Sequence, residues 1–279
     1  MARPRSNITT ITSRKIGKGN DMGGRGTRSS RVAAGGLGLG GGVGIGVPVP
    51  QGPAPNVQPG QPAPAISIAQ LQSMSDAEFV NYINALKSTP IDQNTYFNHD
   101  WDTQRLIANM PELNQAPSVV DANTFAGLPG ETMYRTVNAA GTSSAIDICA
   151  RTMASDVTTI GAGVMGDGFY FSTSLTSSQA GFGNTHGNIN KTATMSCKLN
   201  QNARVVTNTD LNSMLGRESS AVQAAVRNMS SGNTWGGSGS GLMAYALRKG
   251  YNVVSRRDTT FNVIDRRAAT WSDNVIPWS

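Results

Sequence analysis

The fold of this chain is decided by one stretch, Gly166-Asp167-Gly168-Phe169-Tyr170-Phe171-Ser172-Thr173-Ser174-Leu175. A glycine-punctuated turn runs into large aromatic side chains, a pattern that predicts entry into a short strand. Alternate residues of a strand share a face, so Gly168, Tyr170, Ser172 and Ser174 are expected on one side and Phe169, Phe171 and Thr173 on the other. The apolar face suits a core. The hydroxyl-bearing face suits a polar ligand or, as the plainer alternative, solvent at the rim of a sheet.

The charge of the chain is concentrated at its start. The 279 residues are enough for one or two domains, only 14% are charged, and the net charge is +6. Residues 1–31 hold eight Arg and Lys against Asp21 alone, which makes +7 and leaves the remainder at −1. The basic character is therefore a property of the tail and not of the folded part.

Cysteine and histidine are too sparse to organise the fold. Cys149 and Cys197 form no spaced set, and His99 and His186 have no ligand spacing, so neither a disulfide framework nor a metal site is expected. The basic start runs into polar residues, which is not a secretory signal. Gly and Pro interrupt the apolar stretch 33–50, which excludes a spanning helix. We expect a soluble protein of a reducing compartment with no membrane partner.

Residues 1–65 are expected to be a disordered basic tail. Glycine runs and later prolines offer little to bury and no helical period. The segment 23–28, Gly-Gly-Arg-Gly-Thr-Arg, is similar to arginine–glycine segments that bind nucleic acid through phosphate attraction. Nucleic acid is thus one expected partner of residues 1–31, and a solvated tether is the alternative.

Residues 66–110 are expected to be helical. Ser75 and Glu78 have the spacing of a capping box. Apolar side chains then recur at helical spacing at Phe79, Tyr82, Ile83 and Leu86. A second short helix is expected over 102–110, ended by Pro111.

Residues 111–279 are expected to mix strands and helices. In the predicted strand 132–137, Arg135 shares a face with Met133 and Val137, so its burial requires a carboxylate or an anionic ligand. A surface or structural salt bridge is the alternative. The match of residues 161–166 to G-x-G-x-x-G is rejected as a dinucleotide motif, because a strand and not a helix follows it. Strands without regular alternation favour an α+β fold. Further strands are expected over 192–199, 204–207, 251–255 and 259–264, and further helices over 143–154, 219–229 and 242–249.

In their order, these pieces resemble the ADP-ribosyltransferase superfamily. The stretch from Gly166 to Ala180 looks like that family's aromatic strand and small-residue helix, and Ser172-Thr173-Ser174 matches the Ser-Thr-Ser of its arginine branch. Met133-Tyr134-Arg135 matches the first-strand arginine, and residues 250–254 and 261–266 look like the closing strands. The arrangement is similar to versions encoded by tailed bacteriophages and covers roughly residues 100–270.

The resemblance implies a split β-sandwich with flanking helices that binds NAD, as substrate and without a metal, between two sheets. It implies that Arg135 pairs with the pyrophosphate or ribose, where a planar fork of donors suits anionic oxygens. Ser172 would hydrogen-bond within the site, and either it or Tyr170 would meet the nicotinamide. The remaining expected cofactor contacts are Gly168, Thr173, Ser174 and Thr260.

The chain departs from the family pattern at the catalytic glutamate. Aligned on residues 261–264, that place holds Thr260, which cannot offset the positive charge that develops as nicotinamide leaves. The first acidic place holds Asp258, about 7 Å along the strand. The expected catalytic set is therefore Arg135, Ser172 and Asp258. A carboxylate such as Glu218 swinging in, a site that only binds, or Asp258 as an ordinary strand-edge acid are the alternatives.

Two functions are expected from this resemblance. The first is an NAD-dependent mono-ADP-ribosyltransferase of phage type that modifies a host or virion macromolecule. The second is a catalytically inactive virion structural protein that retains the fold and uses its basic tail to contact nucleic acid or the capsid. Both place the protein in the host cytoplasm or the virion. A plain nucleic-acid-binding module is disfavoured, because the folded part is near neutral.

Overall fold

A computed structural model describes residues 52–57, 61–90, 101–139, 142–154, 165–183, 192–229, 239–257 and 259–277. Within these residues the fold is of the expected α+β class, with one mixed sheet of nine strands in the order β1-β8-β4-β2-β3-β7-β6-β5 and with β9 beside β4. The strands are β1 (Ser118–Val120), β2 (Met133–Asn138), β3 (Phe169–Ser172), β4 (Thr192–Leu199), β5 (Val205–Thr207), β6 (Val253–Arg256), β7 (Thr260–Val263), β8 (Ala269–Ser272) and β9 (Ile276–Pro277).

The helices include those expected near the N-terminus. The Ser75–Glu78 capping box is confirmed at the start of α2. None of the described helices is long and apolar enough to cross a membrane. The helices are α1 (Ile68–Ser73), α2 (Asp76–Ser88), α3 (Trp101–Ala108), α4 (Ala122–Gly127), α5 (Thr142–Met153), α6 (Leu175–Gly183), α7 (Asn208–Gly216), α8 (Ser220–Asn228) and α9 (Gly239–Arg248), with the 3-10 turns η1 (Pro111–Asn114) and η4 (Arg266–Ala268).

The two strands at the middle of the sheet are joined by fewer residue pairs than the strands beside them. One residue pair, Tyr134 with Ser172, joins β2 to β3, whereas six pairs join β2 to β4 and four join β3 to β7. The sheet is therefore a single hydrogen-bonded path made of two well-paired halves, β1-β8-β4-β2 and β3-β7-β6-β5, that meet at one point.

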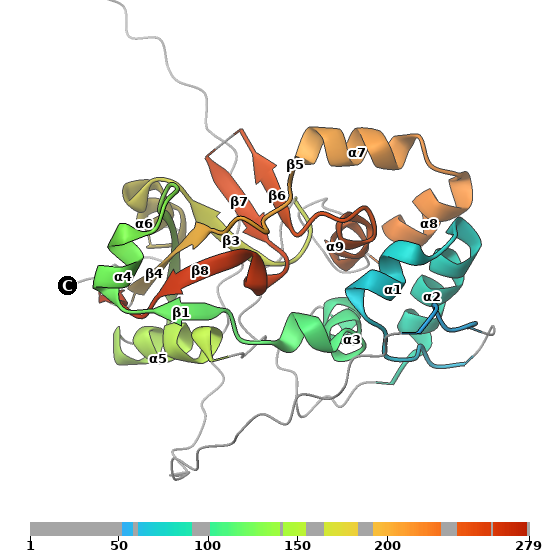
Figure 1. Ribbon diagram of the computed structural model, residues 1–279, viewed down its shortest axis with the longest axis horizontal. Coiled ribbons are helices and arrows are strands. Elements are labelled where there is room, and N and C mark those ends of the chain that lie inside the picture. The colour runs from blue at the N-terminus through green and yellow to red at the C-terminus, as the bar shows by residue number, and fades with distance from the viewer. Residues whose placement is uncertain are drawn as a thin grey trace, which may run out of the picture.

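The helices cover the two faces of the sheet differently. Helix α5 packs against β2 and β4, where its Cys149 lies near Arg135. Helix α6 packs on the other face of β2, where the hydroxyl of Ser178 contacts that of Thr136. Helices α1, α2, α3, α8 and α9 gather at the β5–β6 end of the sheet (Figure 1), where α2 packs on α8 and α1 on α9.

An aromatic cluster fills the core under β3. Trp271 of β8 is fully buried and lies edge-on to Phe169 and Phe171, with ring centroids 5.9 and 5.3 Å apart. Each such pair contributes roughly 0.5–1.5 kcal/mol beyond the area it buries. The apolar face expected for Phe169 and Phe171 is thus confirmed as a core face.

The folded part begins earlier than the sequence indicated. Val57 and Ala63 are buried in the main core. The amide of Gln70 donates to the backbone oxygens of Gly52 and Pro53, at 2.8 and 3.2 Å. The boundary expected at residue 65 is therefore too late, because these short apolar side chains and backbone carbonyls find partners on the N-terminal helices. Residues 1–51, with the expected nucleic-acid contact of 1–31, lie outside the described part.

Candidate functional site

Four side chains form a single row across one face of the sheet, with Ser196 of β4 beyond one end. Strand register pairs Arg256 with Thr260, Thr260 with Ser172, Ser172 with Tyr134, and Tyr134 with Ser196. Residues directly opposite one another on paired strands point to the same face. The row Arg256–Thr260–Ser172–Tyr134 therefore crosses the junction of the two half-sheets with a guanidinium at one end and hydroxyl groups along it.

Ser172 is the centre of this row. Its side chain is buried, and its Oγ accepts a hydrogen bond from the Ser174 backbone N–H at 3.2 Å. The Oγ of Ser174 in turn accepts from the Ser177 N–H at 3.1 Å at the start of α6. The Ser-Thr-Ser triplet thus shapes the turn into the helix. Within the described part of the chain the Ser172 hydroxyl has no acceptor for its own hydrogen, which leaves it able to donate to a ligand.

Arg256 supplies the positive charge of the row. Its side chain is half-buried at the end of β6, and among the described residues it forms no ion pair. Two strand spacings separate it from Ser172, about 10 Å. Thr260 lies between them and is 8% exposed.

A second pair of side chains, two residues along the same strands and on the same face, holds the turn at residues 165–168 in place. Tyr170 pairs with Asn262 across β3 and β7. The Tyr170 hydroxyl donates to the backbone carbonyl of Gly166. The side-chain amide of Asn262 donates to the backbone carbonyls of Met165, Gly166 and Asp167 at 3.1–3.3 Å. Burial raises the pKa of Tyr170 above its ordinary value, and the nearby Asp167 raises it further. The phenol expected to meet nicotinamide is therefore engaged with its own backbone.

The place expected for a cofactor at Gly168 is filled by protein. A Cβ at this residue would overlap the Oδ1 of Asn262. The missing side chain therefore makes room for Asn262 and not for a ligand, which corrects the expected cofactor-binding role of Gly168.

Arg135 lies on the opposite face from Ser172, which corrects the expectation that the two converge. The register pairs Tyr134, not Arg135, with Ser172. The Arg135 guanidinium instead lies over the Phe169 ring, 5.5 Å from its centroid. Its Nη1 donates to the backbone carbonyl oxygen of Tyr170 at 3.5 Å. Burial lowers the pKa of Arg135 to about 10. Arg135 is therefore part of the aromatic core face.

Of the two expected acids, the structure describes only Glu218. Asp258 is outside the described residues. Glu218 is held elsewhere, by Lys249 Nζ at 2.7 Å and by the Tyr245 hydroxyl at 2.8 Å, so it cannot swing in without losing both partners. Asp167 is buried and accepts from the Thr103 hydroxyl.

Three residues of this region were missed from the sequence: Arg256, Tyr134 and Asn262. Tyr134 and Arg256 look like ordinary strand residues, and only the pairing of β2, β3, β7 and β6 shows that they share a face. The signal that was available is alternation: Arg256 and Val254 share a face, as do Thr260 and Asn262.

Comparison of the chain with protein-family models, with curated proteins and with solved structures finds no match. Among the described residues no group of three His, Cys, Asp or Glu side chains is placed to hold a metal ion. The side chains of the row indicate which chemical groups it can bind. A guanidinium and neutral hydroxyls bind anionic and sugar oxygens, but near neutral pH they do not act as general bases.

Proposed function

We propose that this chain binds NAD along the row Arg256–Thr260–Ser172–Tyr134 and acts there as a mono-ADP-ribosyltransferase of phage type. The observation that carries the proposal is the register, which aligns a guanidinium without an ion-pair partner in the described chain and a donor hydroxyl on one face. A planar fork of donors suits a pyrophosphate, and a hydroxyl suits a ribose. A dinucleotide is long enough to meet both.

The division of the sheet also supports this proposal. The resemblance implies two sheets with a cleft between them, and the sheet here divides at the single pair of Tyr134 with Ser172. The strand that ends at the first serine of the Ser-Thr-Ser triplet pairs with β7, to which the resemblance assigns the acid. Thr260 occupies that place, directly opposite Ser172.

In this proposal the missing negative charge is supplied by Asp258, two residues before Thr260 in the sequence. A carboxylate near the departing nicotinamide stabilises the developing positive charge on the ribose, which a threonine does not. Asp258→Asn should then lower turnover far more than NAD binding.

The second candidate function is a non-catalytic structural protein of a virus particle that retains an NAD-binding fold. The observation in its favour is the neutral Thr260 in the row. It predicts that the protein is present in purified particles and that NAD is bound without being cleaved.

The test is incubation of the full-length protein with labelled NAD and host lysate, together with calorimetric measurement of NAD binding. Transferred label or released nicotinamide, lost in Arg256→Gln and kept in Arg257→Gln, supports the transferase. Binding without turnover selects the structural protein. Absence of NAD binding by a folded protein overturns both NAD-binding proposals.

A further inference from the structure

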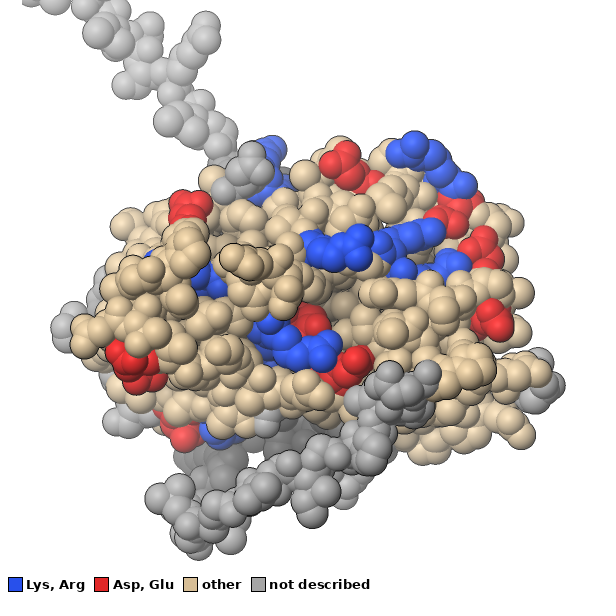
Figure 2. All heavy atoms as spheres, viewed as in Figure 1, with Lys and Arg blue, Asp and Glu red and all other residues tan. Residues whose placement is uncertain are grey.

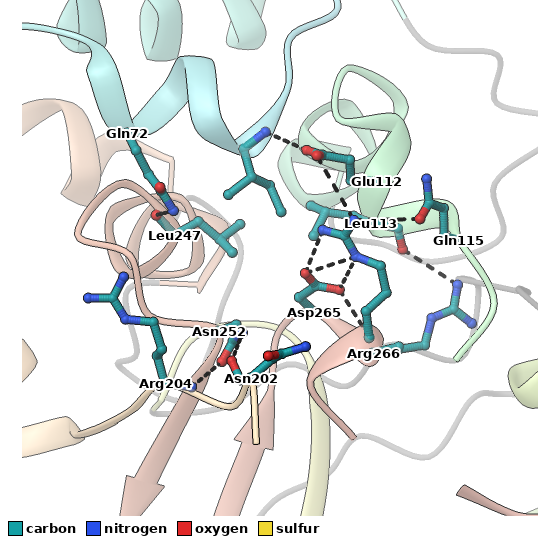
Figure 3. Close-up of polar contacts among 12 residues, drawn as sticks. Gln72, Glu112, Leu113, Gln115, Asn202, Arg204, Leu247, Asn252, Asp265 and Arg266 are labelled. Carbon is teal, nitrogen blue, oxygen red and sulfur yellow. Dashed lines mark hydrogen bonds and ion pairs between the residues drawn. The ribbon is translucent and has the colours of Figure 1, made fainter. Parts of the chain in front are cut away.

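A cavity lies beyond the other end of β6 from Arg256, about 13 Å along the strand. Its volume is about 200 Å³, and its walls come from α1, the end of α9 and the loops beside β5 and β7. Figure 3 shows Gln72, Arg204, Leu247, Asn252 and Asp265 around this space, and Figure 2 shows basic side chains flanking a hollow on the same face of the molecule.

Two arginines line the cavity, and they differ in whether a carboxylate neutralises the guanidinium. Arg267 is neutralised: it makes three contacts of 2.7–3.1 Å with the Asp265 carboxylate and lies 3.9 Å from Glu112. Arg204 has no such partner, because within the described residues no carboxylate or hydrogen-bond acceptor contacts its guanidinium. The lining therefore carries an uncompensated positive charge at Arg204.

The backbone of Arg204 is held by the protein around it, and its exposed side chain lies beside the Tyr251 ring. Its backbone N–H donates to the Asn252 Oδ1 at 2.7 Å, and its guanidinium lies 6.0 Å from the centre of the Tyr251 ring. Gly250 leaves room for it, since a Cβ there would lie 2.9 Å from Nη1, and its φ of +82° also favours glycine. These neighbours set the guanidinium on the wall of the cavity, between Gly250 and the Tyr251 ring.

The Arg204 side chain is not needed to cap the C-terminal end of α9. The carbonyl of Leu247 at the end of this helix accepts from the Gly250 N–H at 2.9 Å and from the Gln72 amide at 3.2 Å, and that of Tyr245 accepts from the Lys249 N–H. These carbonyls are satisfied without the guanidinium. The donors of this exposed side chain are therefore not used by the helix end and remain available to a ligand.

The geometry points to a binding site for a small organic molecule that carries one oxyanion, a carboxylate or a phosphate ester, held by the fork of Arg204. The site is independent of the proposed NAD-binding row. The fork of Arg matches two oxygens of either group, and the charge of Arg204 balances one negative charge. Ile68 and Leu247 provide apolar wall for the rest of the ligand. The volume corresponds to about six or seven waters, below the usual range for drug-sized ligands, which limits the ligand to a small one.

The test is calorimetric titration of the full-length protein with benzoate and with ribose 5-phosphate, which separate the carboxylate from the phosphate ester. Ribose and benzyl alcohol serve as uncharged controls. The variants are Arg204→Gln, Arg204→Lys and, as matched control, Arg227→Gln, whose guanidinium contacts Gln223 on its own helix. Melting temperatures establish that each variant is folded, and Arg204→Lys keeps the charge but loses the fork.

The expected result is binding of at least one anion, weakened by added salt and by at least about tenfold in Arg204→Gln. Arg204→Lys is expected to lie between, and Arg227→Gln to bind like the unaltered protein. The proposal is overturned if neither anion binds, if the uncharged controls bind equally well, or if both Arg204 variants keep full affinity.

Discussion

Arg135 and Ser172 lie on neighbouring strands and face opposite sides of the sheet. The pairing of Tyr134 with Ser172 sets this relationship, and the contact of Arg135 with the Phe169 ring is its consequence. A cation that shares the face of Ser172 is Arg256, two strands away across Thr260. The two arginines should therefore respond differently to substitution.

Replacing Arg256 by Gln is expected to abolish the thermal stabilisation that NAD gives, while the melting temperature without ligand stays nearly unchanged. The side chain is half-buried and forms no ion pair in the described chain, so the fold loses little. Arg257→Gln removes the same charge from an exposed neighbouring residue and should keep the NAD shift. An equal loss in both variants would mean that only net charge matters.

Replacing Arg135 by Ala is expected to destabilise the fold and to leave NAD binding in place. The buried guanidinium packs on Phe169, and its loss removes a desolvated cation–π contact together with aliphatic packing, about 2 kcal/mol or more. Urea denaturation measures the change. If the variant keeps a normal free energy of unfolding but loses the rise in melting temperature that NAD gives, Arg135 belongs to the binding site and not to the core.

Sequence patterns predicted the elements whose formation depends on interactions between residues close together in the sequence. Strand β4 was predicted with its bounds, 192–199, and the cap and stripe of α2 were predicted from spacing alone. Helix α8 was predicted as a helix over 219–229. Helix α7 and strands β8 and β9 were missed. Strand β8 forms because its Trp271 is buried against Phe169 and Phe171, which is a long-range contact that no short pattern carries.

The site was harder to predict than the fold, because it depends on register. Alternation correctly separated Ser172 from Phe171 within β3, but no property of β2 taken alone says whether Tyr134 or Arg135 faces Ser172. A shift of one residue between strands moves every side chain to the other face. Arg256 was overlooked for the same reason.

Replacing Thr260 by Glu is expected to create or increase NAD cleavage. The residue lies directly opposite Ser172, so a carboxylate there would stand where the ribose charge develops. A positioned charge or donor of this kind changes turnover by roughly 10²–10³. Release of nicotinamide is the measurement, and Thr259→Glu, one residue away and exposed, is the control. Turnover that stays flat in a folded Thr260→Glu protein that still binds NAD would argue against the row as a catalytic face.

Replacing Gly168 by Ala is expected to cost about 1–3 kcal/mol of stability through overlap with Asn262. Removal of the Asn262 amide relieves the overlap, although it sacrifices the hydrogen bonds to Met165, Gly166 and Asp167. The double variant Gly168→Ala/Asn262→Ala should therefore be more stable than the sum of the two single changes allows. Additive losses in chemical denaturation would show that the two residues do not compete for space.

The glycines at the start of α9 are expected to matter for packing between helices. The helix here was predicted to begin at residue 242, yet α9 begins at Gly239. The reason is the close approach of α8, because a Cβ on Gly241 would overlap the Val226 carbonyl. Gly241→Ala should thus destabilise the protein by about 1–3 kcal/mol, even though alanine is the better helix former. Gly216→Ala at the end of α7 is the matched control, since nothing lies within 4 Å of a Cβ there and the change should be neutral or slightly stabilising. If urea denaturation shows both variants to be equally stable, the small residues of α9 serve some purpose other than contact with α8.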